Sequence, residues 1–453
     1  FSIAENDKVR TDPERLISKH FKALHNFFKL KKLDTRLLLG SASRKLAGVR
    51  SIEPQIMMPM TEMLEQSISE KEDAKASTFS QFNVVDSPLS LVRDSPVVKP
   101  VFIHDVVDEF VVMTSMMAPR RLSLRGDDGK IYSILCKKDD ELRKDARLIS
   151  FCKMMNCLMR RTPEARRRQL MVRTFSAIPL QACGGIIEWV PNLNTFKQTL
   201  KPLFKEYQQK NLSYVEYNDK WPAEMKLKMM REHFYKIYPK VAAEWQRRAF
   251  SDPCSWHTAR LLFTRSCAVM SMIGFVCGLG DRHADNILID QTDGGIMHVD
   301  FNILFNRGER LGVPEIVPFR LTRNLVDGFG PTGAEGTWRK SAEATLEVMR
   351  ANAETLLTVM QAFIYDPLIE FGDARAQQTK MGQRRVVEAK SKEMVNQVLD
   401  MIKNRLEGHI VTPRTKQKLT KKMSVSGQVA KLYELATDEV LLSQMFSGWS
   451  PYL

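Results

Sequence analysis

The sequence predicts an α+β protein of two lobes, a small β-rich lobe followed by a larger, mainly helical one. Short β-prone runs and turn signals gather between residues 101 and 190, whereas helical periodicity dominates most of the chain that follows. Hydrophobic residues make up 43% and charged residues 27%, the balance of a folded globular protein. A length of 453 residues leaves room for several domains.

The first hundred residues predict a helical segment and then a linker. Apolar residues recur at three-to-four spacing over residues 12–40, which is typical of a helix. Residues 66–100 are rich in Ser, Lys, Glu, Asp and Pro and contain two Asp-Ser-Pro turns, which indicates a loop. Because the chain begins with Phe1, we expect it to be a piece of a longer or processed polypeptide.

The small lobe is predicted from short β-prone runs with two helices among them. A Gly-Asp-Asp-Gly turn at residues 126–129 joins two of the runs as a hairpin. The expected strands are 111–114, 121–124, 131–135, 172–179 and 186–190, and the expected helices are 142–158 and 164–170.

The larger lobe is predicted to be mostly helical from Phe196 to Gly280, with a β-rich patch at 287–300 and helices again after Leu321. The uncharged apolar stretch 266–280 is shorter than the roughly 20 residues that a membrane span needs. We therefore interpret it as a buried core helix and expect no membrane partner.

The net charge is +15, and the excess basic residues are clustered. Solvated helix faces explain such clusters best, although attraction to phosphate-rich or acidic partners is the alternative. Since no nucleic-acid-binding motif accompanies them, charge alone does not predict a DNA-binding module. The clusters are Arg160, Arg161, Arg166, Arg167, Arg168 and Arg173, and then Arg414, Lys416, Lys418, Lys421 and Lys422.

The seven cysteines include no Cys-x-x-Cys pair, and most stand among apolar residues. Such cysteines behave as small hydrophobic residues. This usage fits a reducing compartment, the cytosol or the nucleus.

The densest group of polar side chains lies around a predicted hairpin. Asp281, His283 and Asn286 precede its first strand, and Asp300 ends its second. Phosphoryl transfer needs such a set, because one carboxylate accepts the proton of the attacking hydroxyl while oxygen ligands hold Mg²⁺ against the phosphates. Asp281 and Asn286 are five residues apart, the spacing that protein kinases use for the base and the amide ligand.

Two other interpretations of this group remain open. Asp and Asn favour turns, so each residue taken alone could simply cap a loop. A zinc site from His283, His298, Asp285 and Asp300 is conceivable, but no third His or Cys stands at ligand spacing.

The motif Gly-Asp-Arg-His-x-x-Asn at 280–286, followed by His-Val-Asp-Phe at 298–301, resembles the catalytic and metal loops of the phosphatidylinositol-3-kinase-related protein kinases. The resemblance runs from about residue 100 to the end and includes 142–145, 313–322 and the final 448–453. The stretch 268–273, and Asp-Phe-Asn in place of Asp-Phe-Gly at 300–302, point to the ATR-type checkpoint branch. Asn302 tolerates unusual backbone angles better than most residues do.

The resemblance implies a bilobal protein-kinase-like fold with a helical N-terminal extension and a short helical C-terminal segment. The implied divisions are the end of a preceding helical (FAT-type) region at 1–55, a linker or start of the small lobe at 56–100, the small lobe at 101–188, the larger lobe at 189–420 and a FATC-type segment at 421–453. We expect residues 424–453 to pack beneath the activation loop.

The resemblance also implies the role of each site residue, with ATP and Mg²⁺ (or Mn²⁺) as cofactors. Asp281 would be the base, His283 would stabilise the transferring group or orient the base, and Asn286 and Asp300 would bind the metal. Lys137 would reach the ATP phosphates, paired with Asp145 or Asp140, although the neighbouring Lys138 leaves this choice open. The remaining nucleotide contacts would be Arg121 from a phosphate-covering loop, Ile187, Trp189 and Val190 in the connector, and Leu288 and Val299 beneath the adenine. Ordinary core packing is the alternative for the hydrophobic members of this set.

Substrate class follows from residues 301–322, the expected activation loop. Arg307, Arg310 and Arg320 stand there against Glu309 and Glu315, without the dense basic cluster that a phosphoinositide headgroup would require. A protein hydroxyl is therefore the better acceptor, and the resemblance implies Ser or Thr followed by Gln. A lipid kinase and an inactive pseudokinase scaffold are the alternatives.

The family further implies partners and location. These are an ATR-interacting regulatory protein, protein activators, single-stranded DNA reached indirectly through partners, a dimer of heterodimers and residence in the nucleus.

Overall fold

The computed structural model describes residues 101–113, 118–138, 140–180, 184–208, 215–365, 384–410 and 421–453. The helix expected at 12–40 and the linker expected at 66–100 lie outside these residues. The described residues form two compact units, an N-terminal unit that contains 101–149 and 175–190 and a C-terminal unit that contains 150–174 and the described residues from 191 to 453. Residues 150–174 therefore belong with the larger unit, a grouping that sequence pattern alone did not predict.

The N-terminal unit contains a five-stranded antiparallel sheet in the order β1-β2-β3-β5-β4. Gly185 on β5 has no side chain because a Cβ there would overlap the backbone of Ile178 on β4. The predicted 172–179 strand is shorter than expected, since only its last three residues pair. The strands are β1 (Ile103–Val112), β2 (Arg120–Gly126), β3 (Ile131–Lys138), β4 (Ala177–Pro179) and β5 (Gly184–Glu188).

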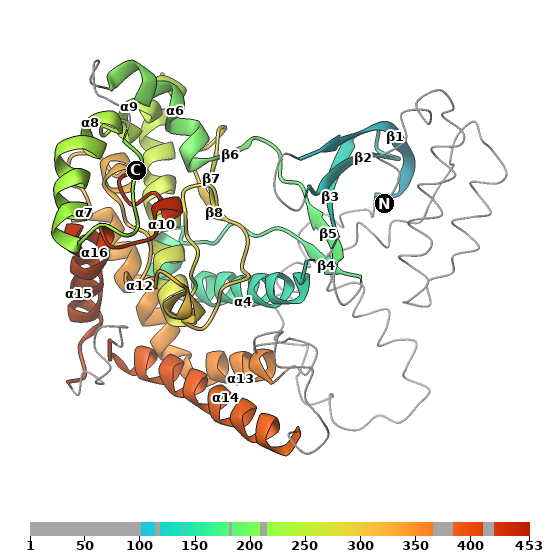
Figure 1. Ribbon diagram of the computed structural model, residues 1–453. Helices are drawn as coiled ribbons and strands as arrows, with labels where there is room; N and C mark the ends of the chain where they lie inside the picture. Colours follow the sequence, from blue (N-terminus) through green and yellow to red (C-terminus); the bar gives the residue numbers. More distant parts are fainter. Residues whose placement is uncertain are drawn as a thin grey trace. The chain divides into compact units, whose positions relative to one another are not determined.

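The C-terminal unit is mainly helical, as predicted, and α10 (Pro253–Cys277) runs through the middle of its helices (Figure 1). Asp252 caps this helix by accepting the N–H of Ser255 at 2.8 Å. By length and composition α10 could cross a membrane, but 78% of its apolar window is buried inside the protein. Every residue from Ser266 to Cys277 is buried, so the prediction of a core helix is confirmed.

Among the helices, α10 packs chiefly against α9, α11, α12 and α14. Two predicted helices, at 142–158 and 164–170, correspond to α4 and α5. The elements are α4 (Leu142–Arg161), α5 (Pro163–Arg167), α6 (Phe196–Tyr207), α7 (Ala223–Met229), the π-helix η6 (Met230–Phe234), α8 (Tyr235–Ile237), α9 (Ala242–Ala249), the 3₁₀ helix η7 (Arg307–Arg310), α11 (Arg323–Gly328), α12 (Thr337–Ala351), α13 (Ala353–Ile364), α14 (Arg384–Glu407), α15 (Val425–Thr437), α16 (Glu439–Leu442) and the 3₁₀ helix η10 (Ser447–Trp449).

A second, three-stranded sheet lies beside α10 (Figure 1). Its antiparallel order is β6 (Leu193–Thr195), β7 (Ile287–Asp290) and β8 (Ile296–His298). The β7–β8 hairpin is the one predicted from the sequence, whereas β6 is an addition. Arg173 pins the hairpin turn by pairing with both Asp290 and Asp293.

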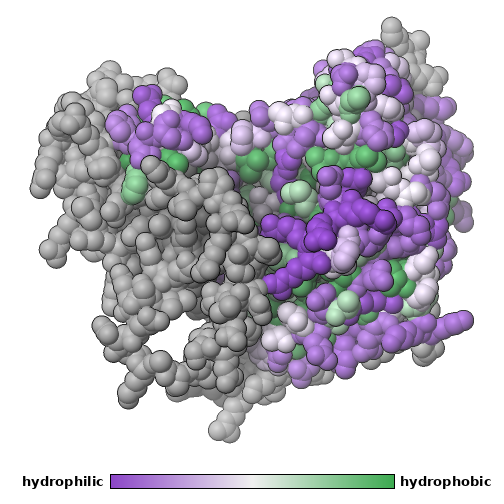
Figure 2. All heavy atoms as spheres, turned by 180° about the vertical axis from the view of Figure 1, so that it is seen from behind, coloured by the Kyte–Doolittle hydropathy of each residue, from purple (hydrophilic) through white to green (hydrophobic). Residues whose placement is uncertain are grey.

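The basic clusters are partly used within the fold. Arg167 and Arg168 both pair with Glu164, at 2.5 and 2.7 Å. Seen from behind, the described surface is mostly hydrophilic, with apolar residues in patches between (Figure 2). These observations favour the interpretation of solvated helix faces, while residues 411–420 of the second cluster lie outside the described part.

The cysteines within the described ranges are all free thiols. Burial raises the pKa of Cys136, Cys152 and Cys267 to about 12, so these thiols stay protonated. They act as apolar core residues, as the sequence predicted.

Candidate active site

The end of α10 places the first predicted site loop. The helix stops at Gly278, which adopts a left-handed conformation with φ of 60°. The chain then runs beside residues 303–306, because Gly280 donates to the carbonyl of Ile303 at 2.9 Å and Asn306 donates to that of Gly278 at 3.0 Å. These backbone bonds fasten the loop 278–286 to the segment 300–322.

Asp281 stands on this loop with its side chain 41% exposed. Its own backbone is left-handed, with φ of 55°. The N–H of Asp281 donates to both carboxylate oxygens of Glu315, at 2.8 and 3.1 Å. A partly exposed carboxylate on a tied backbone suits a group that must meet a substrate.

His283 lies next to Asp281. Its Nδ1 accepts the N–H of Asp285 at 3.2 Å, which leaves the proton of the neutral ring on Nε2. Nε2 is 3.9 Å from Oδ1 of Asp281, too long for a hydrogen bond but on the same side. Burial lowers the pKa of His283, and the neighbouring Asp281 opposes this only in part.

Asn286 and Asp300 meet at the base of the β7–β8 hairpin. The side-chain amide of Asn286 donates to the carbonyl of Asp281 at 2.9 Å, and Val299 donates to the carbonyl of Asn286 at 3.1 Å. The amide is therefore anchored through its nitrogen, and its oxygen remains available as a ligand. The carboxylate of Asp300 makes one long bond to the N–H of Asn302, at 3.4 Å.

Arg282 holds the two loops together, a role that the sequence did not predict. Its side chain is only 3% exposed and donates to three backbone carbonyls, those of Gly280, Val299 and Asp300. One guanidinium thus crosses from the loop of the base to the residue of the predicted metal ligand. Its place in the motif between Asp281 and His283 was the only signal available in the sequence.

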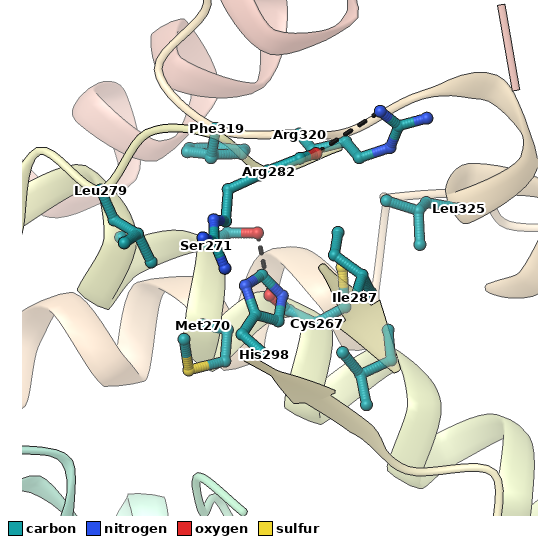
Figure 3. A pocket seen from close by; sticks show the side chains of 12 residues that line it. Cys267, Met270, Ser271, Leu279, Arg282, Ile287, His298, Phe319, Arg320 and Leu325 are labelled. Carbon is teal, nitrogen blue, oxygen red and sulfur yellow. Dashed lines mark hydrogen bonds between the residues drawn. The ribbon is translucent and has the colours of Figure 1, made fainter. Parts of the chain in front are cut away.

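A small pocket lies behind the loop and contains three basic side chains, Arg282, His298 and Arg320 (Figure 3). His298 is half-buried, its Nδ1 is enclosed without a hydrogen-bond partner, and desolvation lowers its pKa well below the usual value. Asp285 is engaged elsewhere, accepting from Thr195 at 3.1 Å. The described residues include no group of three or more His, Cys, Asp or Glu side chains able to hold a metal, which disfavours the zinc alternative.

Glu315 and Arg320 are turned inward rather than displayed to a substrate. Arg320 is 3% exposed and donates to the carbonyls of Trp449 at 2.6 Å and Ser450 at 2.9 Å. It also reaches the carbonyl of Arg282 at 3.5 Å, the contact drawn in Figure 3. Burial lowers the pKa of Arg320 to about 9, so it remains a cation at neutral pH.

The C-terminal segment packs against residues 316 and 317. Met445 and Trp449 form a buried cluster with Met230 and Leu442, and Ile316 packs on it. The N–H of Ile316 points to the sulfur of Met445 at 3.5 Å. The C-terminal segment therefore supports the 300–322 segment from within the same unit.

In the N-terminal unit, Lys137 and Asp140 form an ion pair at 2.7 Å, with side chains 18% and 12% exposed. Lys138 is exposed, which favours Lys137 as the inward lysine. Asp145 is buried in the first turn of α4.

Arg121 lies on β2, as the strand predicted at 121–124 requires, rather than in a loop over the phosphates. Its guanidinium stands 5.1 Å from the ring centre of Trp189, beyond the end of β5. The N–H of Trp189 donates to the carbonyl of Ser133 at 3.0 Å, which continues the sheet past Ile187. Trp189 and Val190 are both half-buried.

Leu288 and Val299 belong to the C-terminal unit and are also half-buried, whereas Ile287 and Ile289 beside them are fully buried. Strand alternation explains the difference for Leu288, whose side chain points to the opposite face from its neighbours. Both residues thus keep some open surface, which complete core packing would remove.

Comparisons with known proteins identify the family of the chain. The family model described as phosphatidylinositol 3- and 4-kinase matches residues 131–373, and the FATC domain model matches 422–453. The chain is 37% identical over 351 residues to protein kinase rad3 of Schizosaccharomyces pombe, covering 76% of this chain and 14% of that protein. It is 36% identical to the serine/threonine-protein kinase ATR of Arabidopsis thaliana, covering 77% and 12%. The chain thus spans only about one seventh of the length of these relatives.

Solved structures are similar as well. The structure titled "FAT and kinase domain of CtTel1" matches with a TM-score of 0.71 and 26% identity, covering 100% of this chain and 29% of that one. This likeness confirms the predicted kinase-like fold, and the relatives confirm the resemblance inferred from the motifs. The chain therefore belongs to the phosphatidylinositol 3- and 4-kinase family, in the group of protein kinases that includes ATR, rad3 and MEC1.

Proposed function

We propose that this chain is the kinase region of a checkpoint protein kinase that transfers the terminal phosphoryl group of ATP to Ser or Thr. The observation that carries the proposal is the convergence of Asp281, Asn286 and Asp300, which backbone hydrogen bonds and Arg282 hold together. Residues spaced along the sequence as a base and two metal ligands are thus neighbours in the fold.

Asp281 would act as the base. Its carboxylate is partly exposed and would accept the proton of the substrate hydroxyl as that oxygen bonds to phosphorus and ADP leaves. His283 presents a neutral ring with Nε2–H directed to the same place. A neutral donor there would stabilise negative charge on the transferred group without competing for the proton.

Asn286 and Asp300 fit a divalent cation, since each offers an oxygen with little or no competition from the protein. Mg²⁺ prefers such oxygen ligands and keeps waters and phosphate oxygens as the rest of its shell. A bound ion there would neutralise charge on the phosphates. Mn²⁺ would be an acceptable substitute.

The ATP contacts proposed in the N-terminal unit are Lys137 with Asp140, and Trp189 with Val190. The ion pair at 2.7 Å supports Lys137, because a lysine held in place can serve as a fixed phosphate donor. Arg121 is proposed to support the ring of Trp189 instead of covering phosphates, as their 5.1 Å separation suggests. Asp145, Ile187, Leu288 and Val299 remain proposed members of the nucleotide site.

A protein acceptor is favoured over a lipid. Of the three arginines in residues 301–322, Arg320 is buried and committed to the C-terminal segment. Only Arg307 and Arg310 remain for a substrate, too few for a multiply phosphorylated headgroup. The named protein kinases among the relatives support the same choice, and we propose the Ser/Thr-Gln preference by analogy with them.

Binding partners and subcellular location are also proposed by analogy with the relatives. They are an ATR-interacting regulatory protein, protein activators, indirect contact with single-stranded DNA, and the nucleus. A dimer of heterodimers is proposed, and the solved relative titled "Complete CtTel1 dimer with C2 symmetry" supports a dimeric core. We also keep the divisions at 1–55, 56–100, 101–188, 189–420 and 421–453 as proposed domains.

Transfer of ³²P from Mg-ATP to a Ser-Gln peptide tests the function. We expect the complete polypeptide to label it and Asp300→Ala to lose about 100-fold or more of the rate, because the metal ligand is gone. A matched peptide with Ala in place of Gln should be a poorer substrate. Glu347→Ala, on the exposed face of α12, is the control and should retain the wild-type rate.

Equal labelling by the intact protein and Asp300→Ala would overturn the assignment. Labelling of phosphoinositide vesicles but not of peptide would favour the lipid alternative. Absence of transfer to either, with the activating partners present, would favour a scaffold.

A further inference from the structure

Within the site, the acid that fixes the backbone of the proposed base is Glu315. We propose that Glu315 is a positioning residue for Asp281, an inference that rests on the proposed function. It would act through the Asp281 backbone and touch neither nucleotide nor peptide.

The contacts are specific to this acid. Both Glu315 oxygens accept the N–H of Asp281, at 2.8 and 3.1 Å, across 34 positions of sequence. Glu315 also donates its own N–H to the carbonyl of Gly308 at 3.0 Å. The backbone of Glu315 is thus bound to its own segment, and its carboxylate binds the opposite loop.

Two glycines make room for the carboxylate. A Cβ on Gly280 would overlap Oε2 of Glu315, and so would one on Gly308. One glycine comes from the loop of the base and the other from the 300–322 segment. The acid is therefore enclosed from both sides, which restricts the direction from which it can hold Asp281.

The backbone of Asp281 needs such a partner. A φ of 55° places it in the left-handed region, which costs a non-glycine residue roughly 1–2 kcal/mol. Residues keep such a conformation only when the surrounding structure restrains them, and strained residues of this kind are frequent at functional sites. The two-centre hydrogen bond from the Asp281 N–H supplies that restraint on the residue whose side chain must meet the substrate.

The choice of a carboxylate is costly for stability alone. In the described part of the chain Glu315 forms no ion pair, and it is half-buried, where desolvation raises its pKa. The Asp281 carboxylate nearby disfavours its charge further. An apolar residue would avoid both costs, so the presence of an acid at this position points to a role in the site.

The neighbouring Glu309 provides an internal control. It lines the same pocket, about 40 Å³ in volume, and burial also raises its pKa. Its carboxylate accepts from the side chain of Asn306 at 2.5 Å and makes no contact with Asp281. Changes at Glu309 therefore report on the pocket without touching the base.

The test compares steady-state kinetics and thermal unfolding of the complete polypeptide and its variants. Glu315→Ala should lower kcat by about 10- to 100-fold, because small misplacement of a reacting group costs this much. The KM for ATP should change less than about twofold, because Glu315 makes no nucleotide contact. Glu315→Gln keeps an oxygen in the same place and should recover most of the lost rate. Glu309→Gln should keep the wild-type kcat.

Asp281→Asn separates this inference from the proposed function. It should lose about 100-fold or more of kcat if Asp281 is the base, and full activity would overturn the base and Glu315's role together. If Asp281→Asn is inactive but Glu315→Ala keeps the wild-type kcat, the positioning role alone is wrong. Equal loss in Glu315→Gln and Glu315→Ala, or a loss matched by the folded fraction in each, would also overturn it.

Discussion

Two acidic residues of the proposed site have backbone angles that are unfavourable for residues other than glycine. Asp281 and Asp300 both have positive φ, 55° and 61°. Asp accepts this region more readily than most residues because its short polar side chain can bond locally. The residue that departs from the family glycine, Asn302, does not have a positive φ. The structure thus places the positive φ on Asp300 itself and not on Asn302.

At the same scale, His298 predicts how stability depends on pH. Its pKa is lowered well below 6.5 by burial, and Arg282 beside it adds to the effect. Below pH 6.5 His298 binds a proton in the unfolded chain but stays neutral in the folded chain, so a lower pH favours unfolding. We expect the melting temperature to fall as pH decreases from 7 to 5.5, with a smaller fall in His298→Gln.

The quantity to compare is the slope of melting temperature against pH, because His298→Gln also changes packing and so shifts the melting temperature at every pH. His257→Gln, on the exposed part of α10, should keep the wild-type slope. Parallel pH curves for the wild type and His298→Gln would contradict the prediction.

At the scale of elements, the sequence predicted what local pattern determines. Hydrophobic period and turn residues located α4, α10 and the β7–β8 hairpin. They missed β6, because three residues paired with a strand about ninety positions away carry no period of their own. They also missed Arg282, Glu315 and Arg320 as structural residues, whose roles follow from partners distant in sequence. The candidate site acids could be proposed from the sequence because they flank one hairpin, so that their spacing is local.

The end of α10 offers an element-scale prediction. Gly278 has φ of 60°, and a Cβ there would overlap the backbone of Asn306. Gly278→Ala should reduce the free energy of unfolding by about 2 kcal/mol or more, because it combines left-handed strain with a clash. Denaturant unfolding would measure this loss, and kcat should fall with it, because the helix end sets the position of Asp281.

Gly312→Ala is the matched control, because a Cβ there meets nothing within 4 Å and its φ is not positive. Its stability should change by less than about 0.5 kcal/mol. A similar loss of unfolding free energy in both variants would contradict the prediction that left-handed strain and the clash at Gly278 cause its loss.

At the scale of the whole molecule, the last residues of the chain act at long range in sequence. Arg320 joins the carbonyls of Trp449 and Ser450 to that of Arg282, on the loop of the base. Its guanidinium also lies 4.4 Å from the ring centre of Trp449. The C-terminal segment therefore supports the proposed site, although none of its residues belongs to the proposed catalytic set.

Removing residues 448–453 tests this support. The deletion takes away both carbonyls and the Trp449 ring, and leaves Arg320 a buried cation without its main acceptors, a loss of several kcal/mol. We expect the 300–322 segment to rearrange and peptide phosphorylation to fall about 100-fold or more. Phe446→Ala, in the same segment but 50% exposed, should leave activity close to wild type. A truncated protein with the wild-type kcat would show that the loop of the base keeps its geometry without the C-terminal segment, and that Arg320 finds other acceptors.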